Sequence, residues 1–183
     1  MPSFIPENEL SVVQLNPGVC LDSFSCGDSD LDDFIKIDSP KYQAKSLVST
    51  YICLYHNQPV GYFSICMDAI KLDNKEKVAA FGSDKQHKDF PAMKIARLGV
   101  SKDHQHEGIG TFMVMHAIGR AALFSKDVGC RFVTVDAYPK DEVIKFYKDL
   151  RFLENTADKS GENVSMRFDL IPYLSKISND AKN

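Results

Sequence analysis

Short runs rich in apolar, β-branched and aromatic residues alternate along the chain with polar segments, and they predict β-strands. The runs cover residues 10–16, 47–55, 59–70, 91–100, 130–138 and 163–171. Only the residues HNQ separate the second run from the third, which indicates an antiparallel hairpin. In the run 91–100, we expect Ile95, Leu98 and Val100 to be buried.

Residues 29–37, 110–124 and 141–150 have the apolar spacing of helices. The first segment places Leu31, Phe34 and Ile35 on one face, and Asp28 or Ser29 is a candidate N-cap. Strands and helices in this order predict an α/β fold, in which helices cover the faces of a mixed sheet. We expect a single domain over residues 1–183, with its core in about residues 10–171.

Two segments lack a clear pattern. Residues 71–89 are charged and too long for an ordinary connection, so they are either a functional loop or a partly disordered segment. Residues 172–183 are a polar C-terminal tail, which we expect to be frayed.

Composition narrows the class of protein. No apolar run approaches the roughly 18 residues of a membrane span, and the N-terminus has no signal-peptide pattern, so we expect a cytoplasmic protein without a membrane partner. The five cysteines have no metal-ligand spacing, so we expect reduced thiols and no metal. The formal net charge of −3 lacks the basic footprint of non-specific nucleic-acid binding.

The segment HQHEGIG, residues 104–110, leads from the predicted strand 91–100 into the next helix. A helix start presents backbone N–H groups that bind anions, and glycines at 108 and 110 would let a phosphate approach them. The alternative is that both glycines only allow the helix to pack closely on the sheet. A P-loop is discounted because Thr111-Phe112 follows the last glycine, and a dinucleotide fingerprint is discounted because Met113 replaces its third small residue.

The residues from Gln105 to Gly110 match the Q/R-x-x-G-x-G/A signature of the GCN5-related N-acetyltransferase (GNAT) family, and IARLGV before them resembles the strand that precedes it. FVTVDAY and DEVIKFYKDLRF resemble the family's next strand and helix with its F-Y-x-x-x-G-F ending, carried here by Phe146, Tyr147 and Phe152. Together the motifs are far more specific than any one of them.

Two upstream segments, residues 24–34 and 50–65, are similar to a bacterial subgroup that includes acetyltransferase toxins of toxin–antitoxin pairs. The resemblance covers roughly residues 10–170. It implies a single GNAT domain whose mixed, mostly antiparallel sheet splays apart at the cleft for coenzyme A, with helices on both faces. It also implies acetyl-CoA as co-substrate and no metal.

The resemblance assigns roles to named residues. Backbone groups of Leu98, Gly99 and Val100 would bond the pantetheine amides. The pyrophosphate would lie against the loop and helix start formed by Gln105, His106, Glu107, Gly108, Ile109, Gly110 and Thr111. Tyr147 would be the general acid that protonates the departing thiolate, or would position the thioester.

Several of these side chains have a plainer interpretation. Tyr147 has the spacing of a core-edge tyrosine. Asp136 could orient the amine or cap the turn after its strand, and Cys26 precedes a helix as part of a turn rather than as a nucleophile. The chain departs from the family pattern at Glu107, where positive residues are frequent, and at Arg151, which replaces the glycine of the ending.

Three functions of different class follow. The first is transfer of an acetyl group from acetyl-CoA to a primary amine of a small molecule, peptide or protein, by direct attack on the thioester. The second is a toxin that acetylates the amino group of aminoacyl-tRNA, for which a basic patch from Lys41, Lys45, Lys85 and Lys88 would have to offset the acidic net charge. The third is a non-catalytic CoA-binding regulatory module. Exposed edges of such a sheet often pair between two copies of a chain, so a homodimer is a further possibility.

Overall fold

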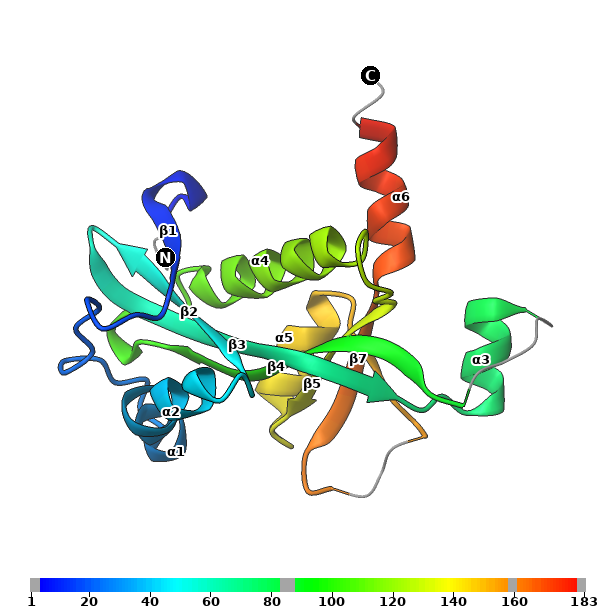
Figure 1. Cartoon of the computed structure of the whole chain (residues 1–183), viewed down its shortest axis with the longest axis horizontal. Helices are drawn as coiled ribbons and strands as arrows, with labels where there is room; N and C mark the ends of the chain where they lie inside the picture. The colour runs from blue at the N-terminus through cyan, green and yellow to red at the C-terminus, as the bar shows by residue number, and fades with distance from the viewer. Residues whose placement is uncertain (1–3, 83–87, 158–160, 181–183) are drawn as a thin grey trace. The chain divides into compact units, whose positions relative to one another are not determined.

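A computed structural model describes residues 4–82, 88–157 and 161–180, which form seven strands and the helices around them (Figure 1). The strands are β1 (Leu10–Gln14), β2 (Ser49–Tyr55), β3 (Gln58–Ile70), β4 (Phe90–Val100), β5 (Phe132–Ala137), β6 (Leu153–Glu154) and β7 (Val164–Asp169). They lie in the order β1-β2-β3-β4-β5-β7-β6 in one mixed sheet. The predicted α/β fold is confirmed.

The α-helices are α1 (Ser29–Asp33), α2 (Ser39–Ala44), α3 (Asn74–Phe81), α4 (Ile109–Phe124), α5 (Asp141–Asp149) and α6 (Leu170–Asp180). Short helices of other types are η1 (Glu7–Glu9), η2 (Phe34–Asp38) and η3 (Lys102–His104). The described residues form two compact units. The first unit comprises Met1–Cys66 and Ile95–Ala117, and the second comprises Met67–Lys94 and Ile118–Asn183. Strands β3 and β4 and helix α4 belong partly to each.

The predicted hairpin is the centre of the first unit. Strands β2 and β3 pair antiparallel, with Tyr55 opposite Gln58. The two turn residues, His56 and Asn57, have φ angles of 47° and 61°. Positive φ at both central residues is the geometry of a tight hairpin turn whose twist matches that of the strands.

Helices of the first unit cover both faces of its strands. Gly61 and Tyr62 are consecutive in β3, so they face opposite sides of the sheet. On one side, a Cβ atom at Gly61 would lie 2.8 Å from the Cε atom of Met113 in α4. On the other side, the Tyr62 hydroxyl donates a hydrogen bond to the carbonyl of Leu31 in α1 over 2.8 Å. The core on this side comprises Leu15, Phe24, Cys26, Phe34, Ile35, Ile52 and Tyr62.

The predicted helix 29–37 begins as expected and continues further. Asp28 caps α1, since its carboxylate accepts hydrogen bonds from the amides of Asp30 and Leu31. The chain then passes through the wider π-helical turn η2 into α2, where Pro40 is in the first turn. Proline has no N–H to donate to the preceding turn, and a helix that continues into it must change its hydrogen bonding there.

The second unit contains the strand pair β5 and β7 and the short strand β6, which the sequence analysis missed. Its core comprises Ile70, Leu72, Phe90, Ala92 and Phe132. In β4, which both units share, Ile95 is buried as predicted, but Leu98 and Val100 are only half-buried. Two of the three burial predictions for that strand were therefore too strong.

Part of the segment 71–89 is a helix, which corrects the prediction of a functional loop or a partly disordered segment. The helix α3 begins with a capping box: the Asp73 carboxylate accepts from the Glu76 amide, and the Glu76 carboxylate accepts from the Asp73 amide. The sequence DNKE carries this signal, because an N-cap residue followed three positions later by Glu favours a helix start. Residues 83–87 lie outside the described part of the chain.

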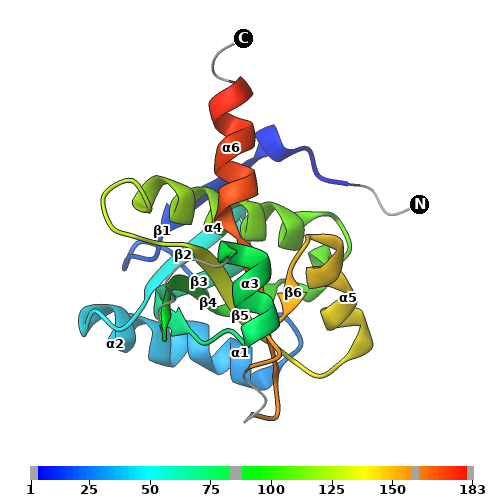
Figure 2. The same ribbon diagram turned by 90° about the vertical axis from the view of Figure 1, so that its right-hand side faces the viewer.

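Part of the predicted frayed tail is helical instead, because α6 covers residues 170–180 (Figures 1 and 2). Asp169 ends β7 and accepts a hydrogen bond from the Ile171 amide over 2.9 Å, which satisfies one of the free donors of the helix start. Leu170 is fully buried. Residues 181–183 lie outside the described part of the chain.

Candidate active site

The first unit contains the strand–loop–helix segment that the sequence predicts. Strand β4 ends at Val100, and α4 begins at Ile109. The Phe112 amide donates to the Gly108 carbonyl over 3.0 Å. The amides of Ile109, Gly110 and Thr111 come before that bond, and helix geometry gives such amides no acceptor within the helix. They are the donors that an anion at this helix start would use.

Gly108 needs to be a glycine for two local reasons. Its φ angle is 89°, a conformation that side chains disfavour. A Cβ atom there would also lie 2.9 Å from the Cδ1 atom of Phe4, which comes from the N-terminal segment. The Ile5 amide donates to the Glu107 carbonyl over 3.1 Å. This N-terminal contact could not be predicted, because nothing in the local sequence pattern near Phe4 indicates it.

The loop is held by its own side chains. The Gln105 amide nitrogen Nε2 donates to the carbonyl of Cys26 over 2.9 Å, which ties the loop to the turn before α1. His104 and Glu107 form a hydrogen bond of 2.8 Å between Nδ1 and Oε2. The negative charge of Glu107 is thereby directed at a histidine of the same loop, which reduces the conflict between this residue and an anion site.

Gly99 in β4 is required by packing. A Cβ atom at this position would lie 2.8 Å from Cε1 of Tyr62 and 3.5 Å from the sulfur of Cys26. Burial raises the pKa of the Cys26 thiol to about 11, so the thiol is protonated at neutral pH and is a poor nucleophile. The interpretation of Cys26 as part of a turn agrees with this environment.

Tyr147 lies on α5, in the second unit, and its side chain is buried. Its ring packs edge-on against those of Phe146 and Phe152, at centroid distances of 5.0 Å and 5.3 Å. Burial raises the pKa of the phenol well above its ordinary value of 10. The hydroxyl therefore keeps its proton throughout the neutral and mildly alkaline range.

This burial makes an alkaline titration informative. Tyr62 and Tyr147, two of the seven tyrosines, both have a pKa that burial raises. A raised pKa in the folded state gives stability that is complete below about pH 10 and decreases as the pH rises above the unfolded value. We expect tyrosinate absorbance to show two phenols that ionise only when circular dichroism reports unfolding. Fewer than two late-ionising phenols would contradict the burial of both rings.

One face of the second unit carries polar side chains next to its apolar core, and we call this polar part the polar face. The Thr134 hydroxyl donates to the Asp68 carboxylate over 2.7 Å, from β5 to β3. Lys94 of β4 contacts Asp136 of β5 as an ion pair, with side chains that are 29% and 41% exposed. Asp136 is thus paired with a cation at the end of its strand.

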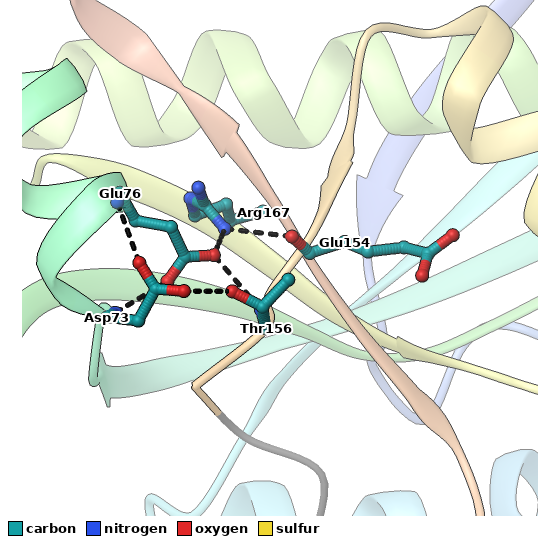
Figure 3. A network of polar contacts seen from close by, with 5 residues as sticks. All are labelled: Asp73, Glu76, Glu154, Thr156 and Arg167. Carbon is teal, nitrogen blue, oxygen red and sulfur yellow. Dashed lines mark hydrogen bonds and ion pairs between the residues drawn. The ribbon is translucent and has the colours of Figure 1, made fainter.

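A polar network joins α3 to β7 at the end of this face (Figure 3). Arg167 donates to the Glu76 carboxylate over 2.8 Å and to the Glu154 carbonyl over 3.0 Å. The Thr156 amide donates to Glu76 over 3.0 Å, and its hydroxyl donates to Asp73 over 2.6 Å. Burial by itself would raise the pKa of Glu76, but the hydrogen bonds and the Arg167 charge hold it below its ordinary value.

A comparison with protein families decides the class of this chain. The model of the family described as "Acetyltransferase (GNAT) family" matches residues 22–152. The chain belongs to the GNAT acetyltransferase family. It is an N-acetyltransferase with acetyl-CoA as its co-substrate, so the resemblance found in the sequence is confirmed.

Individual acetyltransferases are also similar to the chain. The "tRNA-acetylating toxin" of Mycobacterium tuberculosis is 24% identical over 131 residues, which are 71% of this chain and 76% of that protein. The structure of AtaT complexed with acetyl-methionyl-tRNAfMet is 22% identical, with a TM-score of 0.79 over 92% of this chain and 99% of that chain. The crystal structure of AtaTR bound with AcCoA is 20% identical, with a TM-score of 0.75 over 93% and 98%.

The predicted site residues of this GNAT acetyltransferase fall into both units. The ten predicted to bind the cofactor are near-consecutive around the end of β4 and the start of α4 in the first unit, whereas Tyr147 is in the second. Among the described residues, no group of three or more His, Cys, Asp or Glu side chains is arranged to hold a metal ion. No described helix has the length and apolar composition of a membrane span.

The four lysines of the predicted basic patch fall in different parts of the chain. Lys41 and Lys45 are exposed at α2 in the first unit, and Lys88 is exposed in the second. Lys85 lies outside the described residues. A basic patch formed by these four lysines therefore stays a prediction.

Proposed function

We propose that this acetyltransferase transfers the acetyl group of acetyl-CoA to the α-amino group of aminoacyl-tRNA. The observation that carries the proposal is the match to the tRNA-acetylating toxin, which extends over 71% of this chain. This similarity favours aminoacyl-tRNA as the acceptor over the primary amines of small molecules, peptides and proteins. In this proposal the chain is the toxin of a toxin–antitoxin pair.

The cofactor is bound mainly by backbone. Leu98, Gly99 and Val100 at the end of β4 bond the pantetheine amides, as an added strand would. The segment from Gln105 to Thr111 holds the pyrophosphate through its amides. The positive φ of Gly108 and the three amides before the first helical hydrogen bond of α4 support this assignment. Backbone dipoles suit an anion site in which His104 already pairs with Glu107.

The reaction is a direct acyl transfer. The neutral amine attacks the thioester carbonyl, the C–N bond forms, and the C–S bond breaks with its electron pair leaving on sulfur. Tyr147 gives its proton to this thiolate, the nitrogen loses a proton to solvent, and the Tyr147 phenolate regains a proton from solvent. An α-amino group has a pKa near 8, so a substantial neutral fraction is present at physiological pH.

We expect the purified protein to transfer radiolabelled acetyl groups from acetyl-CoA to charged tRNA. Mild base should then release N-acetylated amino acid from the tRNA, because the ester bond is labile and the new amide is not. Deacylated tRNA is the matched control. The assay should begin at low salt, since the net charge of −3 gives little attraction for a polyanion.

Two results would contradict this proposal. Equal or greater kcat/KM for lysine peptides or simple amines would point to one of those acceptors instead. Tight acetyl-CoA binding with no transfer to any acceptor would favour a non-catalytic CoA-binding module.

A further inference from the structure

The polar face of the second unit contains side chains from four neighbouring strands, β3, β4, β5 and β7, and from α3. Thr134 and Asp136 are two residues apart in β5, so both point to the same face. Arg167 of β7 is directly opposite Thr134, and directly paired residues share a face. Asp68 is on this face because it accepts the Thr134 hydroxyl, and Lys94 is there because it contacts Asp136.

The charges on this face do not balance. Arg167 is matched by Glu76, and both side chains are almost entirely buried, at 11% and 10% exposure. Asp169, opposite Phe132 on this face, is matched by Arg131. The other charged groups named here are the carboxylates of Asp68 and Asp136 and the ammonium of Lys94. A partly exposed surface with an excess carboxylate favours a further cation.

The ion pair between Lys94 and Asp136 is accessible to a ligand. Its two side chains are 29% and 41% exposed, unlike the buried pair of Glu76 and Arg167. Ion pairs with this degree of exposure contribute little to stability, so a competing cation displaces the lysine at small cost. Asp136 is the penultimate residue of β5, and the chain continues from it into α5, which carries Tyr147.

We propose that Asp136 binds the ammonium group of the acceptor in exchange for Lys94. The inference rests on the proposed function for the identity of the ligand, which is the protonated α-amino group of an aminoacyl ester. Asp136 orients the amine, and the nitrogen releases one proton to water before it attacks. Lys94 is the cation that occupies the carboxylate when no acceptor is bound.

The exchange predicts opposite effects of two substitutions. Asp136→Asn should raise the acceptor KM by about tenfold or more, because it replaces a hydrogen bond between charged groups by a weaker one to a neutral amide. Lys94→Met should lower the acceptor KM by a few-fold, because it removes the competing internal cation. The KM for acetyl-CoA should be unchanged in both variants. If the ion pair is only structural, both variants should instead lower the melting temperature and raise the acceptor KM together.

A binding experiment separates this inference from the proposed function. With CoA in place of acetyl-CoA, methionine methyl ester should bind the wild-type protein, and Asp136→Asn should weaken this binding about tenfold. N-acetylmethionine methyl ester has no ammonium group, so its binding should not respond to the substitution. The exposed pair on α5, tested as Lys145→Met and Asp149→Asn, is the matched control.

The outcomes can be told apart. Failure to acetylate any aminoacyl-tRNA would refute the proposed acceptor, whereas a charge-dependent response of ester binding to Asp136 would still support the amine subsite. Equal binding of the ester to wild-type and Asp136→Asn protein, or weaker binding to Lys94→Met, would overturn the exchange.

Discussion

Replacement of Tyr147 with phenylalanine is expected to reduce kcat for acetyl transfer by about 10²-fold, the size of effect of one acid catalyst. The substitution keeps the ring contacts with Phe146 and Phe152 and removes only the hydroxyl. Desolvation that raises the pKa of the phenol also raises that of a thiolate formed beside it, so the proton transfer remains nearly balanced. Rapid-quench measurement of N-acetyl product at saturating acetyl-CoA checks the rate.

The KM for acetyl-CoA and the melting temperature should stay close to the wild-type values. Tyr173→Phe is the matched control, since its ring packs against Phe168, in the same unit. If the loss in Tyr147→Phe appears as weaker acetyl-CoA binding or lower stability, Tyr147 positions the thioester or packs the core, and another group is the acid.

Replacement of Glu76 with glutamine is expected to destabilise the protein by about 3–5 kcal/mol, because it leaves the Arg167 charge nearly buried without its carboxylate. The two side chains are 10% and 11% exposed, so solvent screens their interaction poorly. Chemical denaturation monitored by circular dichroism measures the change in free energy of unfolding. The double variant Glu76→Met with Arg167→Met should recover much of this loss, because it removes both charges together.

The pH dependence of the free energy of unfolding shows whether the Glu76 carboxylate stabilises the folded protein. Its folded-state pKa is lowered below the ordinary value of 4.5, so its stabilising effect is present above that pH. The effect decreases as the pH falls through the lower, folded-state pKa. Stability of Glu76→Gln should therefore fall less steeply than that of the wild type below about pH 4.5. Parallel curves in acid would show that Glu76 has no such role.

Local sequence was sufficient where a structural feature depends on neighbouring residues. The turn between β2 and β3, the Asp28 cap of α1 and the loop between β4 and α4 all follow from short patterns. The capping box of α3 is equally local, and DNKE would have predicted it. The charged composition of residues 71–89 instead led to the prediction of a functional loop or a partly disordered segment. The helix α6 was missed for the same reason, because polar composition outweighed the cap at Asp169.

The predicted site also has features that local sequence could identify and others that depend on the fold. The family signature lies within a few residues, so the loop from Gln105 to Thr111 and the aromatic pair Phe146 and Tyr147 could be found from spacing. The sequence could not say why Gly99 must lack a side chain, because the reason is the Tyr62 ring on a neighbouring strand. It could not place Phe4 against Gly108 either, since the two are joined only through the fold.

The sequence by itself determined the family, the co-substrate and the strand–loop–helix segment, because these depend on backbone geometry that short motifs encode. Only the tertiary structure decided which charges meet. Lys94 and Asp136 are 42 residues apart, and Glu76 and Arg167 are 91 apart. Side-chain periodicity tells which face of a strand a residue is on, but strand order and register decide which residue lies beside it. The burial that raises the pKa of Tyr147 has the same origin, because it depends on the packed surroundings of the ring rather than on its own segment.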